Sequence, residues 1–144
     1  MPSGLFAWHL NKVTDPHGNT MTFTYMRDTN TNFLYPEFLE YTSNIYQSLP
    51  AFAKVEFVYE TRPDYAPKYS TGYSMYANKR LKQIFVKAAN TLQRRYDLTY
   101  AQSPQTDRSL LTSVTQIGSN GTSSLPPVTF AYQNDTMNFN VATL

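Results

Sequence analysis

Apolar and polar residues alternate with a period of two along much of this chain, and this pattern constrains the fold more than any other sequence feature. Residues 6–10 carry apolar side chains at every second position, and Met21, Phe23 and Tyr25 alternate with threonines. Successive side chains of an extended strand point to opposite faces, so this period is typical of a half-buried strand. Apolar residues at helical spacing are nearly absent. The sequence therefore predicts an all-β fold.

A turn signal separates these first two alternating stretches. It consists of Asp15-Pro16-His17-Gly18-Asn19, in which proline presets φ and glycine supplies a positive φ. Two alternating stretches joined by such a segment are typical of a β-hairpin. We therefore expect a hairpin over residues 5–27 with a loop of about five residues.

Three further pairs of stretches repeat this arrangement. They are residues 38–42 with 54–59, 81–86 with 93–100, and 111–117 with 128–132. Each second arm closes on a tyrosine that follows an apolar residue by two positions, as in Phe23/Tyr25, Phe57/Tyr59, Leu98/Tyr100 and Phe130/Tyr132. Uneven spacing of these tyrosines argues against a strict solenoid. We expect consecutive antiparallel hairpins that form a sheet or a sandwich-like segment.

These hairpins occupy most of the chain. We predict a single β-hairpin-rich domain over residues 1–132, followed by a tail, linker or strand of a missing neighbour over residues 133–144. Residues two apart share a face, so the closing rings are expected to pack into a core. On that basis, Trp8→Ala and Tyr132→Ala should each cost about 3–5 kcal/mol.

Composition narrows the classes of function. The chain has no cysteine, which excludes disulfides, thiol catalysis and thiolate zinc sites. Twelve basic and ten acidic residues give a net charge of +2, which gives no reason to expect a nucleic-acid partner. The start lacks a signal peptide, and the longest apolar run falls far short of the roughly 20 residues that cross a bilayer. We expect no membrane insertion by this segment.

A partial calcium motif provides the candidate metal ligands. Asp28, Asn30 and Asn32 match the first half of an EF-hand-type loop, in which alternate oxygens face one ion. Phe33 occupies the position of the sharp-turn glycine, and Leu39 replaces the bidentate glutamate at the twelfth position. A polar loop between strands is therefore the favoured interpretation, and Asp28→Ala should cost little stability.

No residues in the sequence form a recognisable catalytic set. His9 and His17 have no acidic partner at a known spacing, and there is no Gly-x-Ser-x-Gly turn. Glu56 and Glu60 lie about 13 Å apart along one strand, too far for a glycosidase dyad. Cross-strand charge pairing is the favoured role for such carboxylates. We expect no enzyme activity, no catalytic residue and no cofactor.

Tyrosines between the second and third hairpins suggest an alternative function. Aromatic faces bind the apolar faces of sugar rings, and the candidates for such ligand stacking are Tyr65, Tyr69, Tyr73 and Tyr76. A carbohydrate-binding or adhesin β-sandwich module is therefore the alternative.

Six segments, in chain order, resemble the SpvB/TcdB-like family of bacterial toxin proteins. They are residues 8–25 (WHLNKVTDPHGN followed by FTY), 55–64 (VEFVYETRPD), 80–84 (RLKQI), 95–100 (RYDLTY), 109–114 (SLLTSV) and 125–132 (LPPVTFAY). Tyr96-Asp97 is also similar to the tyrosine-aspartate (YD) repeats of RHS proteins.

This resemblance implies one segment of a large secreted bacterial virulence protein. It implies a non-catalytic scaffold or encapsulation module, whose partners are neighbouring β-propeller and RHS-shell segments of the same or a partner toxin chain. Salmonella-type relatives carry ADP-ribosyltransferase activity in a separate domain. No Glu-x-Glu pair is present here, so that activity is not carried over to any residue.

Overall fold

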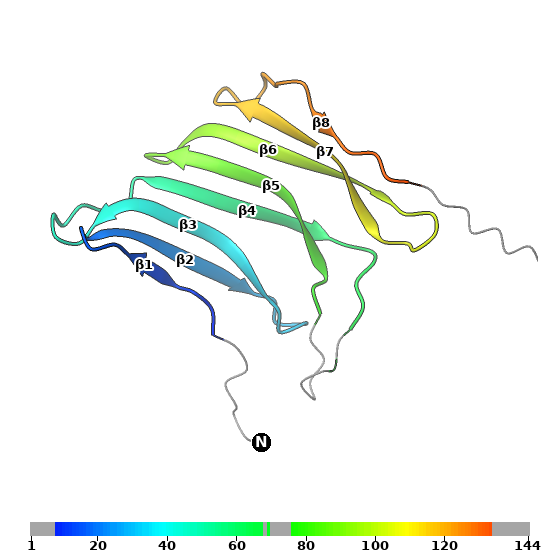
Figure 1. The fold of residues 1–144 in the computed structure, drawn as a ribbon, viewed down its shortest axis with the longest axis horizontal. Helices are drawn as coiled ribbons and strands as arrows, with labels where there is room; N and C mark the ends of the chain where they lie inside the picture. Colours follow the sequence, from blue (N-terminus) through cyan, green and yellow to red (C-terminus); the bar gives the residue numbers. More distant parts are fainter. Residues whose placement is uncertain (1–7, 68, 70–75, 134–144) are drawn as a thin grey trace, which may run out of the picture.

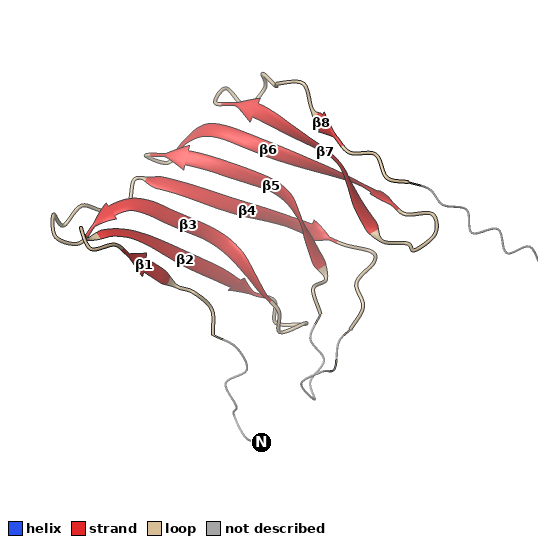
Figure 2. Ribbon diagram, viewed as in Figure 1, coloured by secondary structure: helices blue, strands red, loops and turns tan. Residues whose placement is uncertain are grey.

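The computed structural model describes residues 8–67, 69 and 76–133, which form one open antiparallel β-sheet (Figures 1 and 2). Its strands are β1 (Lys12–Thr14), β2 (Asn19–Arg27), β3 (Leu34–Asn44), β4 (Ala53–Thr61), β5 (Lys79–Ala88), β6 (Thr91–Gln102), β7 (Ser109–Gly118) and β8 (Val128–Thr129). Each strand pairs with the next one along the chain. The predicted all-β fold is confirmed, as a single sheet. Across the described ranges there is no helix long and apolar enough to cross a membrane.

All four predicted hairpins are present, as β1–β2, β3–β4, β5–β6 and β7–β8. The first is closed by the predicted turn, in which Gly18 has a φ of 82°. One carboxylate oxygen of Asp15 accepts hydrogen bonds from the backbone N–H groups of His17 and Asn19, at 2.9 and 2.8 Å. The first arm differs from the prediction, because β1 covers only Lys12–Thr14. Residues 8–11 of the alternating stretch lie outside this strand, and residues 5–7 lie outside the described residues.

The sequence did not predict how the hairpins join. β2 pairs with β3, β4 with β5 and β6 with β7. The ladder between β2 and β3, for example, runs from the Asn19–Asn44 pair to the Arg27–Leu34 pair. These ladders turn four hairpins into one continuous meander of eight strands.

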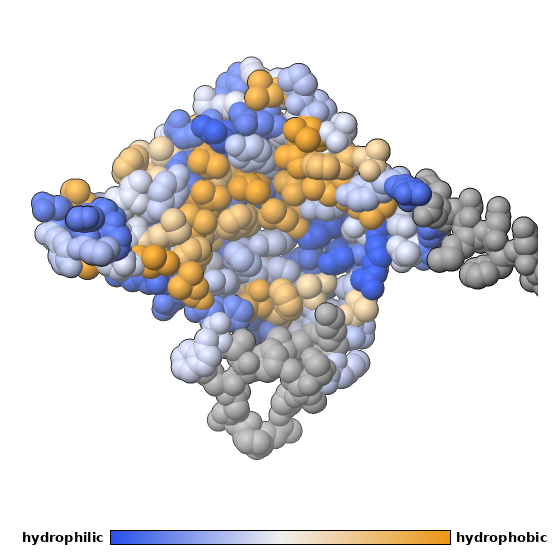
Figure 3. Space-filling view, viewed as in Figure 1, coloured by the Kyte–Doolittle hydropathy of each residue, from blue (hydrophilic) through white to orange (hydrophobic). Residues whose placement is uncertain are grey.

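Burial in the sheet is low, and the predicted aromatic core is wrong. Trp8 is 91% exposed and Tyr132 is 47% exposed, while the buried apolar residues among those described are Tyr35, Ala53 and Ile117. Alternation makes side chains share a face, but the described residues form one sheet and provide no second layer over that face. Figure 3 shows apolar side chains gathered in a broad area across the middle of the sheet. Of the predicted tail over residues 133–144, only Gln133 is described.

Candidate functional site

The closing tyrosines of the hairpins form a repeated hydrogen-bonded row at one end of the sheet. Each hydroxyl donates to a backbone carbonyl of the preceding strand or its lead-in. The pairs are Tyr25 to Leu10 (2.9 Å), Tyr59 to Pro36 (2.7 Å), Tyr100 to Leu81 (2.6 Å) and Tyr132 to Leu111 (2.9 Å). We call these four residues the tyrosine row.

One spacing is common to all four members of the row. In β3–β4 the backbone ladder ends at Phe38 and Glu56; Tyr59 follows Glu56 by three positions, and Pro36 precedes Phe38 by two. The ladders of the other hairpins end at Lys12–Thr22, Gln83–Asp97 and Ser113–Thr129, which give the same two offsets. The tyrosines therefore bridge the point where the two arms of each hairpin stop pairing.

Three of these tyrosines also lie at a register shift with the strand that follows. Opposite Tyr59 the register of β5 jumps from Gln83 to Leu81, which leaves Lys82 as an extra residue. The same jump leaves Glu37 extra opposite Tyr25 and Thr112 extra opposite Tyr100. Such bulges interrupt a ladder locally. Each bulge residue comes directly after the residue whose carbonyl the next tyrosine binds, as Lys82 follows Leu81. The phenol hydroxyl therefore supplies a hydrogen-bond donor at a point where the backbone ladder supplies none.

A network of charged and polar side chains links the loop after β4 to the start of β7. Arg62 donates two hydrogen bonds to Asp64, at 2.9 and 2.6 Å. Asp64 in turn accepts from the backbone N–H of Ser109 at 2.8 Å and from its hydroxyl at 2.6 Å. The Asp64 side chain is only 2% exposed. This carboxylate therefore joins segments that lie 45 positions apart in the sequence.

Arg80 on β5 completes this network. Its guanidinium donates to Glu60 at 2.7 Å and to the Ser109 hydroxyl at 2.8 Å, and it lies 4.5 Å from the ring centroid of Tyr100. We call Glu60, Arg62, Asp64, Arg80 and Ser109 the polar clamp. All five positions belong to segments that carry the toxin-family resemblance.

The electrostatics of the clamp favour its charged form. The hydrogen bonds from Arg62 hold the pKa of Asp64 far below its ordinary value; burial opposes this shift, and the bonds from Ser109 reinforce it. Asp64 raises the pKa of Arg62 through the same contact. Burial raises the pKa of Tyr59 and Tyr100, so both phenols stay protonated as hydrogen-bond donors. Each of these shifts favours the protonation state that the contacts require.

Asp28, in the turn after β2, also joins segments that are distant in the sequence. One of its oxygens accepts from the backbone N–H groups of Asn30 and Thr31, at 2.9 and 3.2 Å, and the other lies 3.2 Å from the Lys79 ammonium. Burial alone raises the pKa of Asp28, but these bonds outweigh it and the pKa is lowered. The aspartate is buried, so the structure leads us to expect a larger cost for Asp28→Ala than the sequence alone suggests.

These contacts bear on the candidate metal ligands. The Asn32 side-chain carbonyl accepts from Arg27 at 2.8 Å, and Asn30 is exposed. Both oxygens of Asp28 are already bound, one of them by a cation that competes with any metal ion. The described ranges hold no cluster of three or more histidine, aspartate or glutamate side chains that could bind a metal ion.

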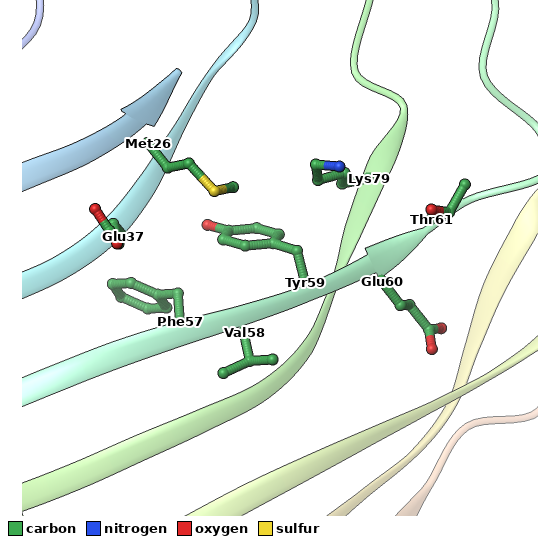
Figure 4. A pocket seen from close by; sticks show the side chains of 8 residues that line it. All are labelled: Met26, Glu37, Phe57, Val58, Tyr59, Glu60, Thr61 and Lys79. Carbon is green, nitrogen blue, oxygen red and sulfur yellow. The ribbon is translucent and has the colours of Figure 1, made fainter. Parts of the chain in front are cut away.

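A hollow of about 500 Å³ lies beside β4, where β3 and β4 diverge. Figure 4 shows Phe57 and Tyr59 on one side of β4 and Val58 and Glu60 on the other. Glu37 lies on the Phe57 side, so the two carboxylates of the lining do not face one another (Figure 4). Glu60 is bound by Arg80, so Glu37 and Glu60 do not form a facing carboxylate pair in this hollow.

The carboxylates considered for glycoside hydrolysis form cross-strand ion pairs. Glu56 lies 2.5 Å from Lys87 on β5, across the ladder, and 3.3 Å from Lys54 on its own strand. The Lys87 ammonium lowers the pKa of Glu56 against the opposing effect of burial. The predicted charge pairing is confirmed for Glu56, and Glu60 pairs in the same way with Arg80.

The candidate sugar-stacking tyrosines are only partly described. Tyr65 and Tyr76 stack on one another, with ring centroids 5.0 Å apart and planes 12° apart, so one face of each ring is occupied. Tyr69 is 66% exposed, and Tyr73 lies outside the described residues. The Tyr65–Tyr76 contact joins the two ends of the β4–β5 loop, and carbohydrate binding stays a prediction.

Together, the tyrosine row and the polar clamp define a single-layer meander of linked hairpins. Solved structures of bacterial toxin proteins share this fold, among them one effector domain and two Tc toxin assemblies. The N-terminal domain of the effector SpvB from Salmonella typhimurium strain LT2 matches with a TM-score of 0.63 and 13% identity, over 75% of this chain and 49% of that one. The resemblance expected from the sequence motifs is thereby confirmed for the fold.

The other two structures are Tc toxin assemblies. TcdB2-TccC3 matches with a TM-score of 0.68 and 16% identity, over 88% of this chain. The Tc holotoxin pore of Photorhabdus luminescens, which carries a TccC3 substitution, matches with a TM-score of 0.69 and 17% identity, over 85%. The chain spans 9% and 8% of those two proteins. No protein-family model matches the sequence, and no curated protein matches it.

Proposed function

We propose that this chain is a non-catalytic structural module of a secreted bacterial toxin of the SpvB/Tc type, in which it forms part of a scaffold or encapsulating shell. Its partners are neighbouring β-rich segments of the same toxin or of a partner chain. The observation that carries the proposal is the open apolar sheet, which has the fold of a segment of two Tc toxin assemblies.

The exposed apolar surface supports a role that needs neighbours. Monomeric proteins rarely expose contiguous apolar patches larger than a few hundred Å². Here large apolar side chains that are at least a third exposed lie on strands and on loops, including Phe52 (60%), Val58 (38%) and Leu125 (57%). Covering them would add about 25 cal/mol of stabilisation for each Å² of apolar surface removed from water.

The contacts of the charged groups support a structural role. Glu60 binds Arg80, Asp64 binds Ser109, and Glu56 binds Lys87, each of which belongs to another strand or loop. These three contacts fix one strand or loop against another. Such residues stabilise a sheet that must present a defined surface to its neighbours.

Covalent footprinting provides the test. Hydroxyl-radical labelling of Phe52 and Tyr46, which are 60% and 68% exposed, should be strong in the isolated chain and should fall several-fold when the chain is part of its assembled toxin. Trp8, which is 91% exposed, reports on the β1 end of the sheet in the same experiment. Equal labelling in both states would contradict the proposal. Turnover of a glycoside, or of NAD, that is lost in Glu37→Gln or Glu60→Gln would also contradict it.

A further inference from the structure

The two outer edges of the sheet repeat the pattern of its internal interfaces. The ladders between hairpins join an even-numbered strand (β2, β4 or β6) to the odd-numbered strand that follows it. Each of these ladders contains a tyrosine of the row with a bulge opposite it. Each also contains an apolar pair whose even-strand member precedes the tyrosine by two positions. The apolar pairs are Phe23–Leu39, Phe57–Ile84 and Leu98–Val114. In each pair, the residue on the odd-numbered strand lies three positions after the residue that pairs with the tyrosine, as Ile84 does after Leu81. This rule describes three interfaces with no exception.

The β8 edge carries the even-strand half of this pattern. Tyr132 is the fourth member of the row, and Phe130 precedes it by two positions. These side chains are 47% and 43% exposed. Within the described chain, no strand pairs with the outer edge of β8.

The β1 edge carries the odd-strand half. Leu10 supplies the carbonyl that Tyr25 binds, as Pro36, Leu81 and Leu111 do for the later tyrosines. Val13 follows Leu10 by three positions, at the place that an apolar residue occupies in β3, β5 and β7. Leu10 is 56% exposed and Val13 is 46% exposed.

We propose that β8 of one copy of this chain pairs with β1 of a second copy, head to tail and antiparallel, in the register of the internal ladders. Tyr132 then lies opposite Leu10 of the second copy and Asn11 becomes the bulge. Phe130 lies opposite Val13, and Thr129 opposite Thr14. The register alone leads to this pairing, which does not depend on the proposed toxin role.

Strand-edge chemistry favours a second copy of the chain as the partner of these outer edges. An exposed strand edge is a template for another strand, and a cross-strand pair of an aromatic and a β-branched side chain stabilises the contact. The two edges carry different halves of the pattern, so β1 with β1 or β8 with β8 would not reproduce it. The contact is therefore heterologous, and it leaves one free edge on each end of the assembly for growth.

Sedimentation velocity over a range of concentrations tests the pairing. The 144-residue chain should show a mass that rises with concentration. Val13→Lys and Phe130→Lys should each weaken self-association by about tenfold, because either one removes apolar contact from the Phe130–Val13 pair and places an ammonium beside the remaining apolar side chain. Leu49→Lys is the matched control, since Leu49 is exposed but lies away from both outer edges, and it should assemble like the parent. A thermal melt confirms that each variant is folded.

Mixing the two edge variants tests the head-to-tail arrangement. The Val13→Lys chain keeps an intact β8 edge and the Phe130→Lys chain keeps an intact β1 edge. A one-to-one mixture should therefore form a dimer that does not grow further. Three results would overturn the proposal: a parent chain that stays monomeric at every concentration, an edge variant that assembles as well as the parent, or a mixture that forms no dimer.

Disulfide trapping tests the register, since the described chain has no cysteine of its own. Directly opposed residues in an antiparallel ladder have Cα atoms about 4.5–5.5 Å apart, within the range of a disulfide. Thr14→Cys should therefore cross-link with Thr129→Cys under mild oxidation. It should not cross-link with Ala131→Cys, which is diagonal to it at about 7–8 Å. The reverse result would overturn the proposed register.

Discussion

The hydroxyl of Tyr100 donates a 2.6 Å hydrogen bond to the carbonyl of Leu81, beyond the point where β5 and β6 stop pairing. Leu81 is also the residue opposite Tyr59 in the ladder between β4 and β5, and Tyr59 binds the carbonyl of Pro36 in the same way. Leu81 thus contacts two tyrosines, Tyr100 of its own hairpin and Tyr59 of the hairpin before it. The row keeps a sheet with little burial in a fixed register at its diverging end.

Tyr100→Phe should lower the free energy of unfolding by about 1 kcal/mol, because it removes this hydrogen bond and keeps the ring. The Leu81 carbonyl loses a donor at a partly buried site. Tyr96→Phe, on the same strand, is the matched control, because no hydrogen bond of its hydroxyl is present in the described part of the chain. Urea unfolding of both variants measures the difference. Equal losses would show that the row contributes nothing specific.

Asp64→Asn should destabilise the chain by about 2 kcal/mol, the scale of a buried hydrogen bond to a charged group. The substitution removes the charge that holds Arg62 and weakens the link to Ser109. In a double-mutant cycle, the losses from Asp64→Asn and Ser109→Ala should not add, because the Ser109 hydroxyl donates directly to the Asp64 carboxylate. Glu37→Gln, at an exposed carboxylate, is the control and should change stability little. Additive losses would contradict the clamp.

Acid should destabilise the fold over a defined range of pH. The pKa values of Asp15, Asp28, Glu56 and Asp64 are lowered in the folded chain. Stability from these groups is fully present above their ordinary values, 3.8 for aspartate and 4.5 for glutamate. Below those values the unfolded chain binds protons first, so the free energy of unfolding falls as pH falls. Urea midpoints between pH 7 and pH 2.5 measure this, and Asp64→Asn should make the slope shallower.

Much of the local structure followed from the sequence because its causes are local. Period-two alternation identified β2 and the arms of the later hairpins, and the turn residues Asp15 and Gly18 identified the first turn, whereas the alternating stretch before that turn lies outside β1. Alternation predicts which side chains share a face, but it does not reveal whether another layer covers that face. Trp8 and Tyr132 were therefore assigned wrongly to a core.

The clamp escaped prediction because its partners are distant in the sequence. Asp64 follows Pro63 at the end of an alternating stretch, and nothing local in the sequence indicates Ser109 as its partner. The available signal was the R-x-D spacing of Arg62 and Asp64, which places a guanidinium within reach of a carboxylate. The tyrosine row had a visible sequence signature, but its hydrogen bonds depend on where the ladders end.

Asp28→Ala should cost more stability than Asp28→Asn. Asparagine keeps an oxygen for the backbone N–H groups of Asn30 and Thr31 and loses only the charge opposite Lys79. Alanine loses both contacts at a buried position, for which about 1–3 kcal/mol is expected. Thermal melts of both variants measure this order. Calcium should leave the melting temperature of the parent chain unchanged, and an upward shift would revive the metal site through linkage.

Gly18→Ala should destabilise the first hairpin for two separable reasons. The φ of 82° costs about 1–2 kcal/mol for a residue with a Cβ. A Cβ at this position would also overlap the ring of Tyr46, in the turn that leads from β3 to β4. That turn rests on the first one, because the backbone N–H of Ile45 donates to the Gly18 carbonyl at 2.8 Å. The substitution therefore disturbs the contact between two neighbouring hairpin tips.

Gly121 separates the two costs. It has a similar φ of 75°, but a Cβ there meets open space, so Gly121→Ala reports the backbone cost alone. Gly18→Ala should exceed that loss in urea unfolding. In a Tyr46→Ala background the ring is absent, and the cost of Gly18→Ala should fall toward that of Gly121→Ala. If the background made no difference, the exposed Tyr46 ring would have moved aside freely, and the tips of the two hairpins would not be locked by this contact.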